Sequence, residues 1–148
     1  MINSIIFLPL ASVLEKTVLK LVPVRPSEAG AQGVVLERHL LNTPEIALEQ
    51  ARREIVRMAQ TARMGFTDAM DGLLGDDKRK LESAHVAEEF TDTQQYEITT
   101  YLTELSRRQL SEEVSTSLPV LLHTVNDLER IGDHAINVVE IAIRKIEQ

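Results

Sequence analysis

Residues 43–75 read TPEIALEQARREIVRMAQTARMGFTDAMDGLLG, and this stretch decides the fold class. Its apolar residues recur at steps of three and four, as expected for an α-helix with one buried face. They are Leu48, Ala51, Ile55, Met58, Ala62, Phe66, Ala69 and Leu73. Thr43 supplies an N-cap oxygen, Pro44 suits the first turn and Glu45 faces the positive end of the helix dipole. The pattern predicts one long helix that stops at Gly75.

Two further helices are predicted downstream. Asp76 and Asp77 offer the N-cap of the second helix, whose weaker apolar stripe comprises Ala84, Ala87, Thr91, Ile98, Leu102 and Leu105. The third begins at Ser111 and is expected to kink or restart near Pro119. Its stripe comprises Leu121, Val125, Leu128, Ile131, Ala135, Val139, Ala142 and Ile146. Because no strand-like alternation or internal repeat is present, the fold class is all-α, an antiparallel three-helix bundle over residues 44–148.

The N-terminal part differs in character. Residues 1–23 are expected to form a short apolar helical segment, and residues 24–43, which contain Pro and Gly, a linker. The run IIFLPLASVL at 5–14 is too short to cross a bilayer, and the cations that follow it, Lys16 and Lys20, resemble the cytoplasmic exit of a transmembrane helix. A membrane-proximal segment from a truncated transmembrane region is one interpretation. The other is an amphipathic helix that packs Leu10, Leu14, Val18 and Leu21 on the core.

The composition argues against several classes of function. The chain has 148 residues, a formal charge of −7 and no cysteine. This acidity disfavours nucleic-acid binding, and the lack of thiols excludes a disulfide framework and a cysteine nucleophile. The sequence also lacks a GxSxG motif, a Walker phosphate loop and an HExxH motif, so we do not expect an enzyme.

The acidic side chains carry the most informative spacing. Opposite charges lie four residues apart at Glu49/Arg53, Asp76/Lys80, Glu104/Arg108 and Glu140/Arg144, as on a solvated helix face. Like charges share that spacing at Glu45/Glu49, Glu88/Asp92 and Glu129/Asp133. The last two pairs both read ExxxD and lie beside the apolar stripes of neighbouring helices, so four carboxylates are predicted to converge.

Such a cluster, with no thiol present, suits a hard cation such as iron, Mg2+, Mn2+ or Ca2+. Glu88, Asp92, Glu129 and Asp133 are the candidate ligands, although an acidic chain also places some carboxylates at this spacing by chance. Gly132 inside the third helix suggests close approach by another helix or a bound cluster. Possible outer partners of the ligands are Asn126, Asn137 and Glu140, each of which is individually more typical of a hydrated surface, as are His85, His123 and His134.

The stretch NDLERIGDHAINVVE at 126–140 resembles the signature of PhoU-type domains. In order along the chain, LNTPEIALEQARREIVRMAQTA, EEFTDTQQYEITTYLTEL and LLHTVNDLERIGDHA are similar to the C-terminal PhoU domain of sodium/phosphate cotransporters. The resemblance implies a helical bundle, metal binding through the ExxxD motifs and a role in regulating phosphate uptake. Stand-alone PhoU proteins carry two three-helix repeats, whereas this chain has one, so a homodimer is expected to complete the site.

Three function hypotheses follow. The first is a metal-binding regulatory domain of a sodium-dependent phosphate transporter, at the cytoplasmic face of the inner (plasma) membrane, with the transmembrane transport core of the same or another chain as its partner. The second is a stand-alone PhoU-type accessory protein that regulates a separate phosphate uptake and signalling system. The third, a di-iron carboxylate enzyme, is disfavoured because such bundles use two ExxH motifs and only Glu82 to His85 has that pattern.

Overall fold

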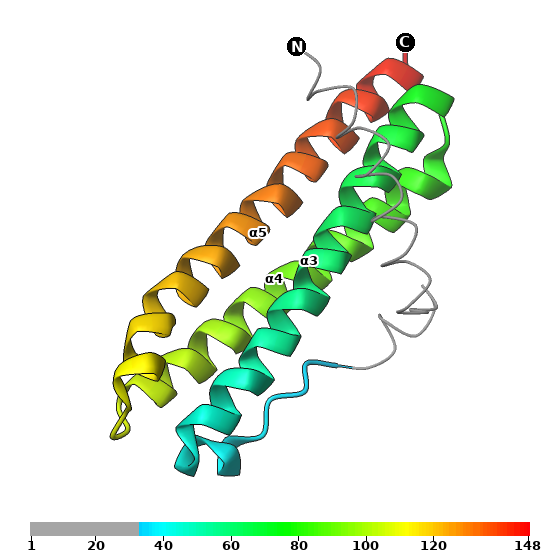
Figure 1. Cartoon of the computed structure of the whole chain (residues 1–148). Coiled ribbons are helices and arrows are strands. Elements are labelled where there is room, and N and C mark those ends of the chain that lie inside the picture. The colour runs from blue at the N-terminus through cyan, green and yellow to red at the C-terminus, as the bar shows by residue number, and fades with distance from the viewer. Residues whose placement is uncertain (1–32) are drawn as a thin grey trace, which may run out of the picture. The chain divides into compact units, whose positions relative to one another are not determined.

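The computed structural model describes residues 33–148, and these residues form three long helices without strands (Figure 1). α3 spans Pro44–Gly75, α4 spans Lys78–Ser106 and α5 spans Glu112–Ile146. Short turns join them, so α4 runs antiparallel to both of its neighbours (Figure 1). The predicted all-α three-helix bundle is confirmed. The predicted segment 1–23 lies outside the described residues, and no helix among residues 33–148 is long and apolar enough to span a bilayer.

Within the predicted linker, a short 3-10 helix, η1 (Arg38–Asn42), leads into α3. Its Leu41 is buried in the core. The Tyr101 hydroxyl of α4 lies 3.2 Å from the Glu37 carbonyl oxygen and 3.1 Å from Gln50 Oε1. These contacts hold the entry to α3 against α4.

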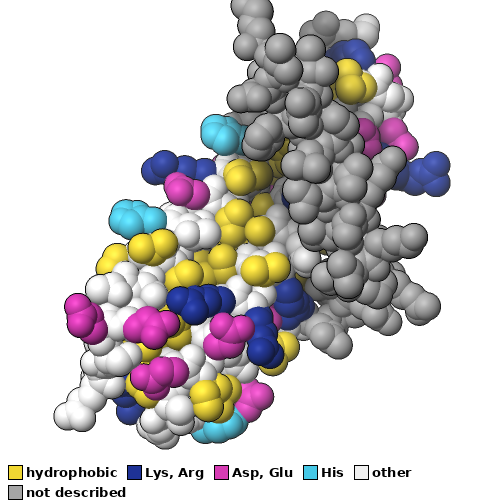
Figure 2. Space-filling view, viewed as in Figure 1, with side chains coloured by type: hydrophobic (Ala, Val, Ile, Leu, Met, Phe, Trp, Pro, Cys, Tyr) yellow, Lys and Arg dark blue, Asp and Glu magenta, His cyan; other side chains and the backbone are white. Residues whose placement is uncertain are grey.

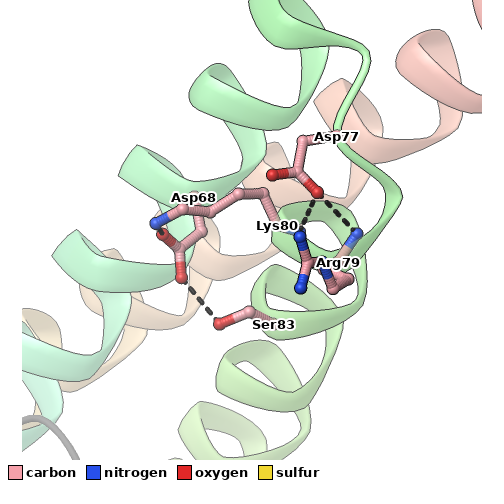
Figure 3. Close-up of polar contacts among 5 residues, drawn as sticks. All are labelled: Asp68, Asp77, Arg79, Lys80 and Ser83. Carbon is pink, nitrogen blue, oxygen red and sulfur yellow. Dashed lines mark hydrogen bonds and ion pairs between the residues drawn. The ribbon is translucent and has the colours of Figure 1, made fainter.

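The helix ends follow the predicted capping residues with two exceptions. Asp77 accepts hydrogen bonds from the backbone N–H groups of Arg79 and Lys80 (Figure 3), and Ser111 caps α5 by accepting from Val114 N. Thr43 occupies the N-cap of α3, but its side chain makes no capping hydrogen bond. The left-handed residue that ends α3 is Asp76, with φ 51°, rather than Gly75, because a short polar side chain also tolerates this conformation.

Side chains tie the α3–α4 turn together. Lys80 Nζ lies 2.6 Å from Asp68 Oδ1, and the Ser83 hydroxyl donates to Asp68 Oδ2 at 2.6 Å (Figure 3). Lys145 Nζ of α5 bonds Asp76 Oδ1 at 2.8 Å and the Leu73 carbonyl at 3.0 Å. The predicted Asp76–Lys80 pair is thus replaced by Lys80–Asp68, which joins α4 to α3, and by Lys145–Asp76, which joins α5 to the α3–α4 turn. The predicted pairs Glu49–Arg53 and Glu140–Arg144 are present.

The core has two apolar clusters at different levels of the bundle. The larger one, at the η1 end, includes Leu41, Leu48, Ile55, Met58, Ile98, Leu102, Leu105, Val114, Leu118 and Val125. The smaller one, near the α3–α4 turn, contains Ala69, Leu81, Ala84, Ala135, Val139 and Ala142. Between them the buried residues are small or polar and include Thr61, Gly65, Thr91, Gln94 and Gly132. We call this level the waist.

At the waist, two residues that we predicted to be core lie at the surface. Phe66 is 38% exposed and Ile131 is 40% exposed, whereas their neighbours Gly65 and Gly132 are buried. Both predictions were wrong because the adjacent glycine, not the large side chain, faces the neighbouring helix. At Gly65 the contact is tight, since a Cβ there would lie 3.0 Å from Ala87 Cβ, whereas Gly132 leaves room for a Cβ in ordinary contact with Thr91 and Glu88. Figure 2 shows hydrophobic side chains exposed among polar ones on the face viewed there.

Pro119 does not interrupt α5, which is one continuous helix from Glu112 to Ile146. The expected restart was therefore wrong. Proline removes one backbone N–H from the helix ladder, which leaves the carbonyl four residues earlier, that of Ser115, without its usual partner. Pro119 and Ser115 are both exposed, so water can satisfy that carbonyl.

Two helical glycines should respond oppositely to replacement by alanine. A Cβ at Gly72 would overlap buried Leu81, with its Cγ at 2.8 Å and the Asp77 carbonyl oxygen at 3.2 Å, whereas a Cβ at Gly132 would lie 3.6 Å from Thr91 Cγ2. We expect Gly72→Ala to destabilise the fold by about 1–3 kcal/mol through overpacking. We expect Gly132→Ala to stabilise it by about 0.5–1 kcal/mol, because alanine is the better helix former. Urea unfolding measures both, and a stable Gly72→Ala variant would contradict the packing described.

Candidate functional site

The candidate site is the seam where α4 and α5 cross the waist. Glu88 and Asp92 lie one turn apart on α4, and Glu129 and Asp133 lie one turn apart on α5. The helices approach each other at Gly132, where a Cβ would be 3.7 Å from Glu88 Cγ. Because the interhelical contact falls beside both pairs, the structure brings the four predicted carboxylates into electrostatic contact. We call them the acidic cluster.

The members of the acidic cluster differ in exposure. Glu88 and Glu129 are half-buried, while Asp92 and Asp133 are exposed as whole residues. Burial, followed by the negative charge of Asp92, raises the pKa of Glu88. Partial shielding of its side chain, followed by the charge of Asp133, raises the pKa of Asp92. The cluster therefore holds negative charge at a cost in free energy.

The pKa of Glu129 depends on both aspartates of the acidic cluster. Burial and then the charges of Asp133 and Asp92 raise the pKa of Glu129. A hydrogen bond between the Glu129 and Asp133 side chains raises that pKa further, because two carboxyl groups can share a hydrogen bond only when one of them is protonated. A cation bound between the two carboxylates would relieve the same repulsion that the proton relieves.

The structure shows a contact between the acidic cluster and His85, which was not among the predicted site residues. His85 Nδ1 lies 3.7 Å from Glu88 Oε2, and the charge of His85 lowers the pKa of Glu88. The three-residue spacing between them was the signal in the sequence, since residues at i and i+3 are neighbours on a helix. The sequence favours a partly buried or surface imidazole at His85, and the residue is exposed. His123 and His134 are exposed.

The three possible outer partners all lie at the surface. Asn126 accepts a hydrogen bond from Gln95 Nε2 at 3.4 Å, which joins α5 to α4 beside the acidic cluster. Glu140 pairs with Arg144 at 3.6 Å, and Asn137 is exposed. Their described contacts are thus with residues outside the acidic cluster, and their role toward a metal stays a prediction.

The donor chemistry of the acidic cluster fits a hard cation, since all its ligating atoms are carboxylate oxygens. Among residues 33–148, no group of three or more His, Asp or Glu side chains is already arranged to hold a metal ion. Metal binding would therefore require side-chain rotation toward the cation, or further oxygen ligands from another copy of the chain.

Residues 33–148 form an all-helical domain of three long helices. The family model for the PhoU domain matches residues 55–142, more than half of the chain. The chain belongs to the PhoU domain family, which points to phosphate-related regulation. Searches of curated proteins and of solved structures gave no match.

The raised pKa values predict how stability depends on pH in the metal-free protein. An acid whose pKa is higher in the folded state binds protons more tightly when folded, so folding is favoured as pH falls through the folded pKa toward the unfolded one. We expect Glu129→Gln/Asp133→Asn to raise the urea midpoint at pH 7 and to weaken this acid stabilisation. Relief of a like-charge pair at i, i+4 is worth about 0.2–0.5 kcal/mol.

Glu97→Gln is the control, since Glu97 is an exposed acid on α4 outside the acidic cluster. Urea titrations at pH 7 and at a series of lower pH values give both quantities. If the double variant and the wild type show the same pH profile, the four carboxylates are not coupled as described.

Proposed function

We propose that the chain is a metal-binding regulatory domain of a sodium-dependent phosphate transport system. The acidic cluster, in a chain of the PhoU domain family, is the observation that carries the proposal. The domain would act at the cytoplasmic face of the plasma membrane against a transmembrane transport core, carried by the same or another chain. The sodium/phosphate assignment is supported by the likeness of residues 41–62 and 88–105 to the cotransporter family.

Electrostatics supports the metal in this proposal. Burial and mutual repulsion disfavour the ionised form of Glu88, Asp92 and Glu129, and an adjacent multivalent cation reverses that preference. Oxygen-only donors select iron, Mg2+, Mn2+ or Ca2+ over softer ions. The role of these side chains would be to bind the cation and to make the stability of the α4–α5 seam depend on it.

Metal should stabilise the wild type through the acidic cluster. A ligand that binds only the folded state adds about 2.7 kcal/mol at a hundred times its Kd. We expect Mn2+ to raise the melting temperature of the wild type, and Glu129→Gln/Asp133→Asn to lose most of that rise. Differential scanning fluorimetry with Mn2+ and with chelator measures the shift, again with Glu97→Gln as the control. Equal shifts in the wild type and the double variant would refute this site.

The same variants test the functional half of the proposal. In cells that depend on this protein for regulated phosphate uptake, the double variant should change the response of sodium-dependent uptake to external phosphate, while Glu97→Gln should not. Uptake of radiolabelled phosphate, measured in phosphate-starved and phosphate-replete cells, gives the readout. An unchanged response in the double variant would separate metal binding from regulation of transport.

A second copy of the chain is a source of the missing ligands. A hard cation takes about six to eight oxygens, and one chain offers two ExxxD pairs. The commonest way to double a ligand set is a two-fold dimer. In such a dimer, Glu129 and Asp133 would lie near the shared surface.

Metal-dependent dimerisation should be directly measurable. We expect sedimentation equilibrium to show a dimer whose dissociation constant falls with Mn2+ and rises with chelator, since a shared cation links the two copies. Glu129→Gln/Asp133→Asn should remain monomeric at the same loading concentrations. A wild type that stays monomeric at every concentration with saturating Mn2+ would rule the dimer out.

A further inference from the structure

The waist buries one side chain whose polar atoms have no partner in the protein. Gln94 of α4 is 0% exposed, and neither its Nε2 nor its Oε1 has a hydrogen-bond partner among the described residues. Buried polar side-chain atoms in proteins bond in most cases to another protein group or to an ordered water molecule. Because an unbonded buried amide is costly in free energy, a further binding partner is expected at Gln94.

Two buried threonines lie at the level of Gln94. Thr91 precedes it by three residues on α4, and residues three apart are neighbours on a helix. A Cβ at Gly65 of α3 would lie 3.0 Å from Ala87 Cβ of α4, so these two residues face each other. Since the two helices are antiparallel, four residues back along α3 correspond to four residues forward along α4 (Figure 1). This register places Thr61 opposite Thr91.

Neither threonine can donate a hydrogen bond to the carboxamide oxygen. The Thr61 hydroxyl donates to the Arg57 carbonyl at 3.1 Å, and the Thr91 hydroxyl donates to the Ala87 carbonyl at 2.8 Å. Each hydroxyl has a single proton, so both oxygens keep only acceptor lone pairs. A rotation of the Gln94 side chain could bring Nε2 to one of these lone pairs, but Oε1 would still lack a donor. The hydroxyl groups at this level therefore leave Oε1 unsatisfied.

We propose that the waist binds a water molecule at Gln94, between α3 and α4. The water would donate one proton to Gln94 Oε1 and the other to Thr61 Oγ1 or Thr91 Oγ1, and a buried water needs at least two such polar partners. Water suits the site because it supplies two donors without burying a charge. It is also small, as are the buried glycines of the waist, Gly65 and Gly132. This inference does not depend on the proposed function.

NMR spectroscopy of the full chain, labelled with 15N and 13C, tests the site directly. A water that stays bound while the protein tumbles gives NOE and ROE cross-peaks of opposite sign to nearby protons, whereas hydrogen exchange gives equal signs in both spectra. We expect cross-peaks of opposite sign between water and the side-chain amide protons of Gln94. Equal signs at this amide, or no cross-peak, would overturn the inference.

A matched pair of glutamine variants locates the water. The Thr91 methyl group is the probe, since Thr91 is 1% exposed and is shielded from bulk solvent. Gln94→Met removes both amide atoms, and we expect the water cross-peak of this methyl group to disappear. Gln95→Met is the control and should keep the cross-peak, because Gln95 is only half-buried and bonds Asn126 instead. Circular dichroism checks that both variants are folded.

A cross-peak that persists in Gln94→Met would arise from exchange of the Thr91 hydroxyl proton and would contradict the proposed site. A crystal structure of the wild type gives a check that needs no variant. We expect an ordered water about 2.5–3.0 Å from Gln94 Oε1. A protein donor bonded to that oxygen, with no water beside it, would overturn the inference, because direct contacts would then satisfy the waist.

Discussion

Close contact between α4 and α5 at the waist is the constraint on which the candidate site depends. Gly132 of α5 lies against Thr91 and Glu88 of α4, and small residues on α3 let that helix pack against the same level. A Cβ at Gly65, for example, would lie 3.0 Å from Ala87 Cβ. Because helices with small residues at their contact approach closely, carboxylates on their flanks come within electrostatic range. Larger core residues here would hold the two ExxxD pairs further apart.

The residues buried at the waist lower the stability of the fold relative to an apolar core. Large apolar side chains lie outside while glycine, threonine and a fully buried Gln94 lie inside, and neither amide atom of Gln94 has a hydrogen-bond partner among the described residues. Outside the waist, beside the larger apolar cluster, Glu54 is also buried, and although Arg57 Nη1 bonds its Oε1 at 2.7 Å, its Oε2 has no such partner among the described residues. An unsatisfied buried polar group costs about 1–3 kcal/mol. Local conflict of this kind concentrates at functional levels of a fold, which agrees with the position of the acidic cluster.

The sequence predicted the helices well because apolar period and capping residues are local signals. Pro44 and Asp77 mark helix starts that the structure confirms. The prediction of buried residues failed where burial depends on contact with a neighbouring helix. Phe66 and Ile131 were predicted to lie in the core, yet the glycine beside each of them is buried instead. The pairing within each ExxxD motif could be predicted, because the spacing of an α-helix fixes it. The electrostatic interaction of Glu88 with Asp133 depends on how α4 and α5 are aligned, which neither motif specifies. A groove of about 340 Å³ between α4 and α5 could not be predicted either, since its lining joins Leu81 to Ile143 across two helices.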